Sequence, residues 1–479
     1  MNEDVIRFLK YLQFKGECAA YQEANPVRFD KELAERCVAE LEAQQDEKVK
    51  ELIKVMPKTP VKVKRNKPKA THKQDGTLNV YGDKWFRLLR EHKLPMNHSE
   101  PVEVVTDYVD ANPNSTDQVK AWLESMGWVP CTYDYKKDNE GEERKIPQVR
   151  KNGELAPSVL ALVEKNPTVE ILDGLTVVQH RLGVFKGFLD SCIVTPTGEY
   201  CLQATVAGLT NTLRFKHKKP LVNLPGVDKP WGKEIRSCLL ANPDEFMSGA
   251  DMVSLESTTK RHYLYPHDPE YAEVMSQPGF DEHVDLAVKA GAVTQDDYDY
   301  YTSTPTVETD PRWKMIHSVR KTYKPVNYSA VYGIGATKLA RETGKSMAEA
   351  KALLEAYWER NWAVKKIAEE QYVKELGGYL WLKNPVSGFY YELRYDKDRF
   401  STLNQGTGVY LFDSWLVRAR TLGYQGQFQF HDETGSSVTN PKETEELLKK
   451  AIEILNKDLT LNVLLDVDVK FGQNYAEVH

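Results

Sequence analysis

An aspartate and a glutamate five residues apart are the first residues of this chain that could do chemistry. Asp251 follows Phe246–Ala250, a stretch that predicts a strand holding the aspartate rigidly at its end. Carboxylate oxygens are natural ligands of Mg²⁺, and phosphoryl transfer uses two divalent cations about 3.5–4 Å apart. Asp251 is therefore a candidate metal ligand for phosphoryl transfer, although an isolated aspartate and glutamate at this spacing are more often a surface acidic patch beside a helix cap.

A second acidic stretch, His431-Asp432-Glu433, lies far downstream. Residues 427–430 alternate polar and apolar side chains and residues 434–438 follow the acidic stretch, which predicts a strand, a turn and a strand. The tip of such a hairpin would push Asp432 into the open, where it can meet Asp251 across a sheet. The sequence therefore predicts two carboxylates for two metal ions.

Four residues between the acidic stretches recur every four positions: Arg320, Lys324, Tyr328 and Tyr332. On an α-helix they form one stripe about 18 Å long. Cations at one end, where the helix dipole favours anions, and aromatic rings at the other suit a nucleoside triphosphate. An amphipathic surface helix with an aromatic core face gives the same pattern. Pro325 is expected to kink the helix or to delay its start to about Lys324, which leaves the position of Arg320 open.

In this order, the stretches 251–256, 320–333 and 431–433 resemble motifs A, B and C of the family A DNA polymerases. The chain is similar to the replicative polymerases of small lytic, podovirus-type phages over roughly residues 27–479, including its closing sequence 471–479. The resemblance implies template-directed addition of dNTPs to a primer 3′ end in phage DNA replication, with two Mg²⁺ ions that Mn²⁺ can replace. The implied catalytic residues are Asp251, Asp432 and Glu433, and the implied metal ligands are Asp251, Asp432 and the backbone carbonyl of Met252.

The resemblance also assigns residues to the incoming nucleotide and to DNA. The implied dNTP-binding residues are Glu256 as a steric gate against a 2′-hydroxyl, His283 in the segment 279–283, Arg320 and Lys324 on the triphosphate, Tyr328 by the sugar and Tyr332 by the templating base. The implied DNA-binding residues are Arg214 in a degraded T-G-R segment, Gln405 in a minor-groove-reading segment and His431 at the primer end. A lone histidine is more often structural, so His283 keeps that alternative.

The implied fold is the α+β right-hand polymerase fold, with an antiparallel palm sheet, helical fingers, a helical thumb and no exonuclease domain. The expected parts are an N-terminal segment 1–26, a thumb 27–157, thumb-to-palm and palm with motif A 158–256, fingers with motif B 257–400 and palm with motif C 401–479. Local patterns predict helices at 27–53, 116–128 and 158–190, with Asp30 as the first N-cap, and a strand at 199–206.

Proofreading is not expected from this chain. Family A replicases usually carry a 3′–5′ exonuclease domain before the thumb, built around a D-x-E strand. Here about 26 residues precede the predicted thumb, and the one early D-x-E string, Asp30-Lys31-Glu32, is better explained as a helix N-cap. The exonuclease is then a separate subunit, part of a split arrangement, or missing.

The composition bounds the class of protein. The 479 residues, 41% apolar and 28% charged, predict a globular chain of two to four subdomains. No run of about 18 apolar residues could span a membrane, and the N-terminus has no signal-peptide pattern. Six cysteines without a CxxC pair predict reduced thiols in the cytoplasm, which is the host cytoplasm if a phage encodes the chain. The net charge of −6 does not exclude DNA, because phosphates respond to local charge.

Local positive charge is concentrated in residues 54–73, where eight lysines or arginines occur without an acidic residue. Three prolines in the stretch argue against a long helix and favour a basic loop or small extended element. Lys62, Lys64 and Arg65 are expected to contact duplex phosphates directly. In the phage relatives a comparable thumb insertion recruits a processivity factor, which is the alternative.

Two rival functions remain. A single-subunit RNA polymerase shares the three motifs in outline, but it would lack a glutamate at position 256 and would read His-Asp-Ser in the third motif, where this chain has Glu433. A non-catalytic DNA-binding replication scaffold with a decayed site is the other rival, favoured slightly by Pro325 and by a degraded segment at 220–225. Retention of both metal carboxylates and both phosphate cations argues against it.

Overall fold

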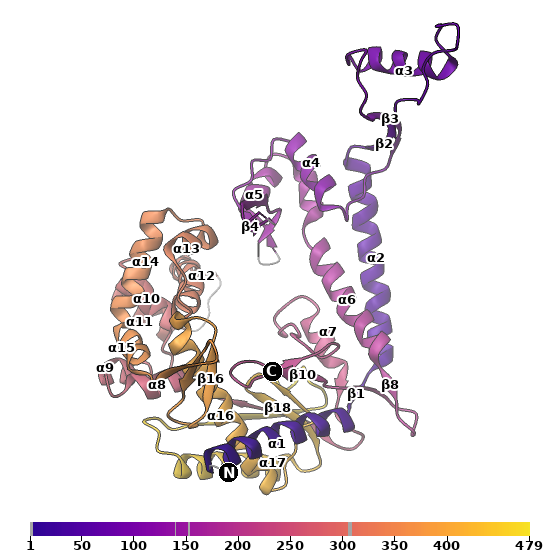
Figure 1. Cartoon of the computed structure of the whole chain (residues 1–479). Coiled ribbons are helices and arrows are strands. Elements are labelled where there is room, and N and C mark those ends of the chain that lie inside the picture. The colour runs from indigo at the N-terminus through magenta and orange to yellow at the C-terminus, as the bar shows by residue number, and fades with distance from the viewer. Residues whose placement is uncertain (1–2, 139, 152–153, 305–308) are drawn as a thin grey trace. The chain divides into compact units, whose positions relative to one another are not determined.

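The computed structural model describes residues 3–138, 140–151, 154–304 and 309–479, so the first two residues of the expected N-terminal segment and four of the expected fingers lie outside it. The chain divides into two compact units, which are Met1–Glu42 with Gln179–His479, and Ala43–Val178. Figure 1 shows the helices and strands of both.

A four-stranded antiparallel sheet in the larger unit, in the order β17-β18-β13-β19, carries both acidic stretches. Its strands are β13 (Phe246–Met252), β17 (Phe428–Phe430), β18 (Glu433–Val438) and β19 (Val467–Gly472). The predicted strand before Asp251 and the predicted hairpin around Asp432 are confirmed. Helices α16 (Arg399–Thr421) and α17 (Pro441–Asp458) bury their apolar side chains against β13 and β19, with Trp415 fully enclosed.

Two glycines allow close packing in this sheet. A Cβ on Gly435 would lie 2.0 Å from the ring of Phe428, its neighbour across the β17–β18 pair. A Cβ on Gly249 would lie 2.8 Å from the side chain of Val478. Because both contacts are with buried groups, a larger residue would force the strands or the chain end to move. The glycines therefore help to fix the position of the sheet beneath the acidic residues.

Five helices of the larger unit surround one core that includes Val284, Ile316, Val326 and Tyr357. They are α10 (Glu282–Lys289), α11 (Gln295–Ser303), α12 (Pro311–Val331), α13 (Ala336–Thr343) and α14 (Met347–Arg360). Figure 1 shows them gathered in one group.

Helix α12 is continuous and begins well before Arg320. Asp310 accepts two backbone N–H groups of its first turn and Pro311 occupies the first helical position, a combination that starts helices strongly. The expected start near Lys324 is therefore wrong, and Pro325 lies inside the helix. Arg320 and Lys324 stand in the body of the helix, so the predicted help of the N-terminal dipole does not apply to them.

A second group of elements connects these helices to the sheet. They are α8 (Leu255–Leu264), α9 (Pro269–Val274), α15 (Trp362–Glu370), β14 (Val373–Leu376), β15 (Tyr379–Lys383), β16 (Tyr390–Leu393) and the short η2 (Asp396–Asp398). Their shared core buries Leu264, Ile367, Leu382 and Leu403. This core joins α8, which follows Asp251 directly, to α16.

The N-terminal segment, for which the sequence analysis predicted no structure, forms α1 (Glu3–Ala24). Its Lys15 is 4% exposed and places Nζ 2.9 Å from both carboxylate oxygens of Asp413 on α16, which is fully buried. The hydroxyl of Tyr11 donates to the same carboxylate. An enclosed ion pair with an extra hydrogen bond therefore anchors α1 to the helix beneath the sheet.

The remaining elements of the larger unit come from two parts of the chain, residues 27–55 and 175–240. They are β1 (Val27–Phe29), α2 (Lys31–Val55), α6 (Leu175–Ser191), β8 (Ile193–Val194), β9 (Tyr200–Leu202), β10 (Val206–Leu209), β11 (Phe215–His217), α7 (Gly232–Ser237) and β12 (Leu239–Leu240), with α2 and α6 crossing the boundary between units. Asp30 caps α2 as predicted, accepting the Leu33 N–H at 2.9 Å. The helix predicted at 27–53 starts later, since Val27–Phe29 pairs with β9 and β12.

The second unit has its own core, with Trp122, Leu123, Val159 and Leu172 buried in it. It contains β2 (Thr59–Arg65), α3 (Val80–Glu91), β3 (Val102–Val109), α4 (Thr116–Ser125), β4 (Tyr133–Lys137), β5 (Glu143–Pro147), β6 (Arg150–Lys151), β7 (Glu154–Leu155), α5 (Pro157–Val163) and η1 (Pro167–Leu172). The helix predicted at 116–128 is confirmed as α4, followed by Gly127 at φ +88°. The single helix predicted at 158–190 is wrong, because Pro167 and Gly174, at φ +74°, break it into α5, η1 and α6.

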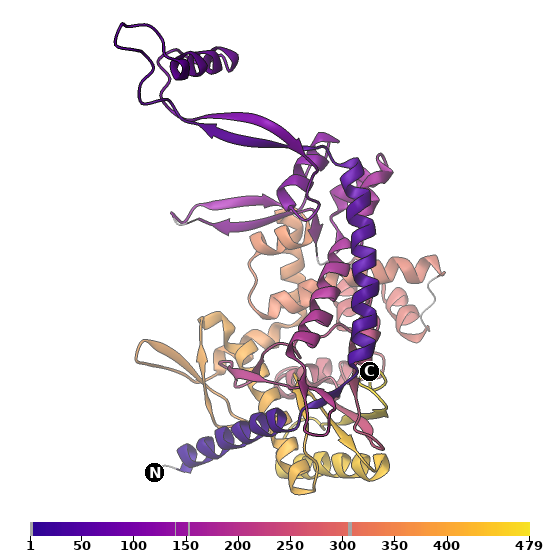
Figure 2. The same cartoon turned by 90° about the vertical axis from the view of Figure 1, so that its right-hand side faces the viewer.

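The basic stretch forms an extended ribbon. Strand β2 pairs with β3, and Figure 2 shows this two-stranded ribbon projecting with α3 at its far end. A small separate cluster of Trp85, Leu89 and Val102 stabilises the end of the ribbon. Among the described residues, no helix is long and apolar enough to cross a membrane.

Replacing Lys15 by methionine is expected to lower the free energy of unfolding by about 3–5 kcal/mol, because it leaves the Asp413 carboxylate buried without its cation. The double variant Lys15→Met/Asp413→Leu should recover most of that loss, since two apolar side chains then fill the site. Urea unfolding measures both. Lys10→Met, at an exposed lysine of the same helix, should stay within about 0.5 kcal/mol of the parent. An equal loss for Lys10→Met would contradict the assignment.

Candidate active site

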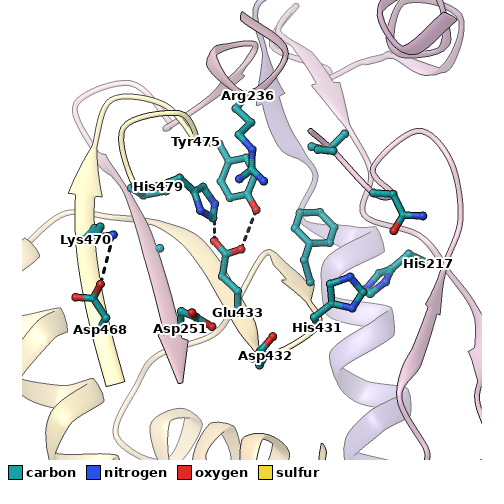
Figure 3. A pocket seen from close by; sticks show the side chains of 15 residues that line it. His217, Arg236, Asp251, His431, Asp432, Glu433, Asp468, Lys470, Tyr475 and His479 are labelled. Carbon is teal, nitrogen blue, oxygen red and sulfur yellow. Dashed lines mark hydrogen bonds and ion pairs between the residues drawn. The ribbon is translucent and has the colours of Figure 1, made fainter. Parts of the chain in front are cut away.

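The register of the sheet collects acidic residues at one end of β13. Asp251 lies opposite Glu433 on β18 and opposite Asp468 on β19, and Asp432 follows at the hairpin tip. These residues line a cavity of about 260 Å³ together with Lys470. Figure 3 shows the side chains from close by. The structure therefore brings the two predicted metal carboxylates to the same cavity.

The charge in this cavity is unfavourable without a cation. Burial raises the pKa of Asp251 to about 7, and the negative charges of Asp432, Glu433 and Asp468 add to the shift, while Lys470 opposes it. A carboxyl group with such a pKa gains by binding a divalent cation, whose charge outweighs the local repulsion. Hard carboxylate oxygens of this kind fit Mg²⁺ or Mn²⁺.

The described residues contain no ready-made cluster of three histidine, cysteine, aspartate or glutamate side chains that could hold a metal ion by themselves. Magnesium is commonly held by only one or two carboxylates, with waters and substrate phosphates completing its shell. Asp251 and Asp432 suit this incomplete type of site. The structure thus agrees with a metal that binds together with a substrate.

Glu433 is the most constrained carboxylate of the group. It is 8% exposed, accepts a hydrogen bond of 2.8 Å from the Tyr475 hydroxyl and lies 3.1 Å from Nε2 of His479. In Figure 3 its side chain points toward these two residues. Tyr475 in turn lies against the guanidinium of Arg236, 4.6 Å from its ring centre. The catalytic role predicted for Glu433 stays a prediction.

The hairpin tip has positive groups beside it. Arg214, between β10 and β11, places a guanidinium nitrogen 3.9 Å from Oδ1 of Asp432. His431 adopts a left-handed backbone conformation, φ 60°, at the turn. Burial and the charge of Arg214 lower the pKa of His431, while Asp432 and Glu433 oppose the shift. Two residues predicted to bind DNA, Arg214 and His431, therefore lie at the acidic centre.

A second and larger cavity, about 670 Å³, opens beside the first between α8, α10 and α12. Glu256, His283, Arg320 and Tyr328 line it, as does Asp432 from the hairpin tip. Four of the six residues predicted for the nucleotide thus share one cavity, in contact with one of the predicted metal carboxylates.

The other two lie close to this cavity. Tyr332, at the end of α12, donates its hydroxyl to Glu256 at 3.5 Å and receives a hydrogen bond from Gln405 on α16. Lys324 is exposed, with Nζ 6.0 Å from the ring centre of Tyr328. Gln405, predicted to read the minor groove, is therefore linked to the expected steric gate through one tyrosine.

Two predicted phosphate ligands are less free than expected. Arg320 forms an ion pair with Asp281, the N-cap of α10. His283 is 4% exposed and accepts from or donates to Asn327 through Nδ1. Asp281 belongs to the segment 279–283 that contains His283, so it could have been predicted to lie at this site. No local sequence pattern predicted the contact of Asn327 with His283, or those of Tyr475 and His479 with Glu433.

Lys62, Lys64 and Arg65 belong to the second unit, on strand β2, and their side chains are exposed. Lys62 lies 3.6 Å from the carboxylate of Glu103 on β3. The ribbon therefore carries some acidic charge that the basic stretch alone did not reveal.

Comparison with known proteins points to one family. A family model described as DNA polymerase family A matches residues 202–379. The DNA-directed DNA polymerase of Escherichia phage T7 is 22% identical, over 96% of this chain and 68% of its own, and that of Enterobacteria phage T3 is 22% identical, over 78% and 53%. The thermostable DNA polymerase I of Thermus thermophilus is 26% identical over 70% of this chain and 40% of its own. The chain thus spans about half the length of the T3 relative and about two thirds of the T7 relative.

A solved structure shares the fold. The POL domain of Pol1 from M. smegmatis, in complex with DNA primer-template and dNTP, matches 97% of this chain and 70% of its own with a TM-score of 0.64 and 18% identity. The predicted α+β fold of a polymerase domain is thereby confirmed.

Replacing Asp251 by asparagine is expected to stabilise the metal-free protein at pH 8 and not at pH 4. The folded pKa of about 7 lies above the ordinary 3.8, so the folded state holds a proton that the unfolded chain releases. The contribution of Asp251 to stability is therefore full below about pH 4 and is lost as the pH rises to 7. Solvent screening at this open site limits the gain to about 1 kcal/mol.

Thermal melting in EDTA at the two pH values measures this gain. Asp190→Asn, at an exposed aspartate of α6, should show no such pH dependence. An equal gain for Asp251→Asn at both pH values would contradict the predicted repulsion.

Proposed function

We propose that this chain, a homologue of the family A DNA polymerases, is the polymerase part of an enzyme that adds dNTPs to a primer 3′ end under the direction of a DNA template. The observation that carries the proposal is the meeting of Asp251 and Asp432 at one cavity, beside a second cavity lined by Glu256, His283, Arg320 and Tyr328. One cavity suits the reacting phosphate and the other suits the rest of the nucleotide.

Asp251 and Asp432, with the main-chain carbonyl of Met252, would hold two Mg²⁺ ions, for which Mn²⁺ can substitute. Bound ions of this kind activate the primer 3′-hydroxyl and neutralise charge on the triphosphate. The chain itself supplies a rigid sheet end that keeps the carboxylates in place. Glu433, whose backbone pairs with that of Asp251 on the neighbouring strand, would be an auxiliary carboxylate of the site.

The helices α10 and α12 would handle the nucleotide. Arg320 and Lys324 supply positive charge for the triphosphate, and Tyr328 and Tyr332 supply rings for sugar and base. The ion pair with Asp281 compensates the charge of Arg320 before the nucleotide arrives. When the nucleotide binds, Arg320 would exchange part of this contact for a phosphate oxygen. Most of the catalysis is then positioning and charge neutralisation.

Glu256 would select deoxyribose. Its side chain lines the larger cavity and accepts from the hydroxyl of Tyr332, and burial raises its pKa. A carboxylate at this place would lie against the sugar and exclude a 2′-hydroxyl. This favours DNA synthesis over the rival single-subunit RNA polymerase, while retention of the carboxylates and of Arg320 and Lys324 argues against a non-catalytic scaffold.

The expected division into parts becomes part of the proposal. Residues 27–157 would form the thumb, with the basic insertion at 54–73, and residues 158–256 the thumb-to-palm region and the first part of the palm. Residues 257–400 would form the fingers and 401–479 the rest of the palm. Primer–template DNA would be bound by Arg214, Gln405 and His431 in the larger unit and by the β2 ribbon in the other. A separate exonuclease subunit and a place in the host cytoplasm complete the proposal, and a processivity factor at the basic insertion is the alternative to direct DNA contact there.

Primer extension by the purified chain with Mg²⁺ tests the function. We expect extension with dNTPs and not with rNTPs, and no trimming of a 3′-mismatched primer. Asp432→Ala should lower the rate by several orders of magnitude, because one metal site is lost, whereas Asp190→Ala should leave it unchanged. A near-normal Asp432→Ala enzyme would overturn the assignment, and absence of extension even with added host or phage extract would favour the scaffold.

The salt dependence of DNA binding tests the basic ribbon. If Lys64 and Arg65 each neutralise one phosphate, the double alanine variant should reduce the slope of log K against log salt by about 2. Lys136→Ala/Lys137→Ala, on the exposed strand β4 of the same unit, removes the same charge and should leave the slope unchanged. Fluorescence anisotropy with labelled primer–template measures both slopes. Equal slopes for the parent and the first variant would point instead to a partner-binding role.

A further inference from the structure

Asn327, one residue before Tyr328, links α12 to α10 from a buried position. Its side-chain Nδ2 lies 3.0 Å from the main-chain oxygen of Glu282 and 3.0 Å from Nδ1 of His283. Asn327 is 7% exposed and His283 is 4% exposed, so water does not replace these contacts. Two of the residues that build the larger cavity are therefore joined by one amide group.

The carbonyl of Glu282 fixes the direction of this amide. A carbonyl oxygen can only accept, so the NH₂ group of Asn327, and not its oxygen, must face Glu282. An NH₂ group has two hydrogens, and the second is directed at Nδ1 of His283. Nδ1 must then accept. A neutral imidazole that accepts at Nδ1 carries its proton on Nε2.

The surroundings keep this imidazole neutral. Burial lowers the pKa of His283, and the charges of Arg320 and Lys324 on α12 lower it further, while Glu282 and Asp281 on the α10 side oppose them. The ring of Tyr328 packs edge-on at 5.4 Å between centroids and restricts rotation of the imidazole.

The opposite edge of the ring remains available. His283 lines the larger cavity, and within the described part of the chain Nε2 has no hydrogen-bond partner. An N–H held in one direction before the ligand arrives binds an oxyanion without the cost of reorienting.

We propose that Asn327 is a positioning residue that holds His283 in the Nε2–H tautomer, so that this N–H is offered to a phosphate oxygen of the incoming nucleotide. The inference deepens the proposed polymerase function and rests on it. If Asn327 only attached α12 to α10, the contact with Glu282 would be sufficient. The additional contact with His283 indicates the positioning role.

The tautomer is measured directly by ¹⁵N NMR of protein labelled on histidine, with the His283 signals assigned by their loss in His283→Gln. We expect neutral His283 at pH 7 with Nε2 protonated, and we expect a non-hydrolysable dNTP analogue bound with primer–template to shift Nε2 and not Nδ1. A proton on Nδ1 would overturn the proposal. This readout does not need activity, so an inactive chain would defeat the proposed function and leave the tautomer test intact.

Steady-state kinetics then separates positioning from attachment. Asn327→Leu should raise the KM for dNTP about tenfold and change kcat less than twofold, because the histidine is no longer held in one form. In a His283→Gln background the same change should alter KM less than twofold, since a glutamine NH₂ donates without help from Asn327.

The control is Asn361→Leu. Asn361 is also buried, and its amide donates to the Tyr357 carbonyl at 3.1 Å and not to a histidine. It should leave the KM unchanged. A tenfold rise from Asn327→Leu in both backgrounds would show a merely structural role and overturn the proposal. If Asn327→Leu fails to fold, the NMR result on the parent protein decides.

Discussion

Mutual repulsion among four carboxylates at the end of one sheet is the constraint on which the site depends. The cavity-facing group is Asp251, Asp432, Glu433 and Asp468. Asp432 lies beside Arg214, and Asp468 forms an ion pair with Lys470. Glu433 contacts Tyr475 and His479. Among the described residues Asp251 has no such partner, and its pKa is raised to about 7. The repulsion is therefore least compensated at Asp251, one of the two carboxylates proposed to hold metal.

The framework beneath the carboxylates has to resist this repulsion. Strand β13 is paired on both sides, and α16 is held from below by the enclosed pair of Lys15 and Asp413. The larger cavity next to it lies among helices that share an apolar core and also polar contacts such as that of Arg320 with Asp281. A sheet end that holds the carboxylates in place, beside an ion pair that a ligand could replace, suits the proposed reaction.

The parts of this arrangement that follow from local sequence could be predicted. Alternation of polar and apolar side chains at 427–430 predicted the strand before Asp432, and a repeat of four predicted the stripe on α12. The parts that depend on distant residues could not. Lys15 finds its partner almost four hundred residues away, and the amide that faces His283 comes from another helix. The prediction of one helix at 158–190 overlooked the helix breakers Pro167 and Gly174. The predicted late start of α12 gave Pro325 too much weight and overlooked the N-cap Asp310.

In the proposed function, the sheet end binds two divalent cations together with substrate. Bound Mn²⁺ can be counted by electron paramagnetic resonance, with a dideoxy-terminated primer–template and the matching dNTP. We expect two Mn²⁺ ions per chain in this complex and a loss of tight binding in Asp251→Asn. The same stoichiometry and affinity in the parent and in Asp251→Asn would contradict it.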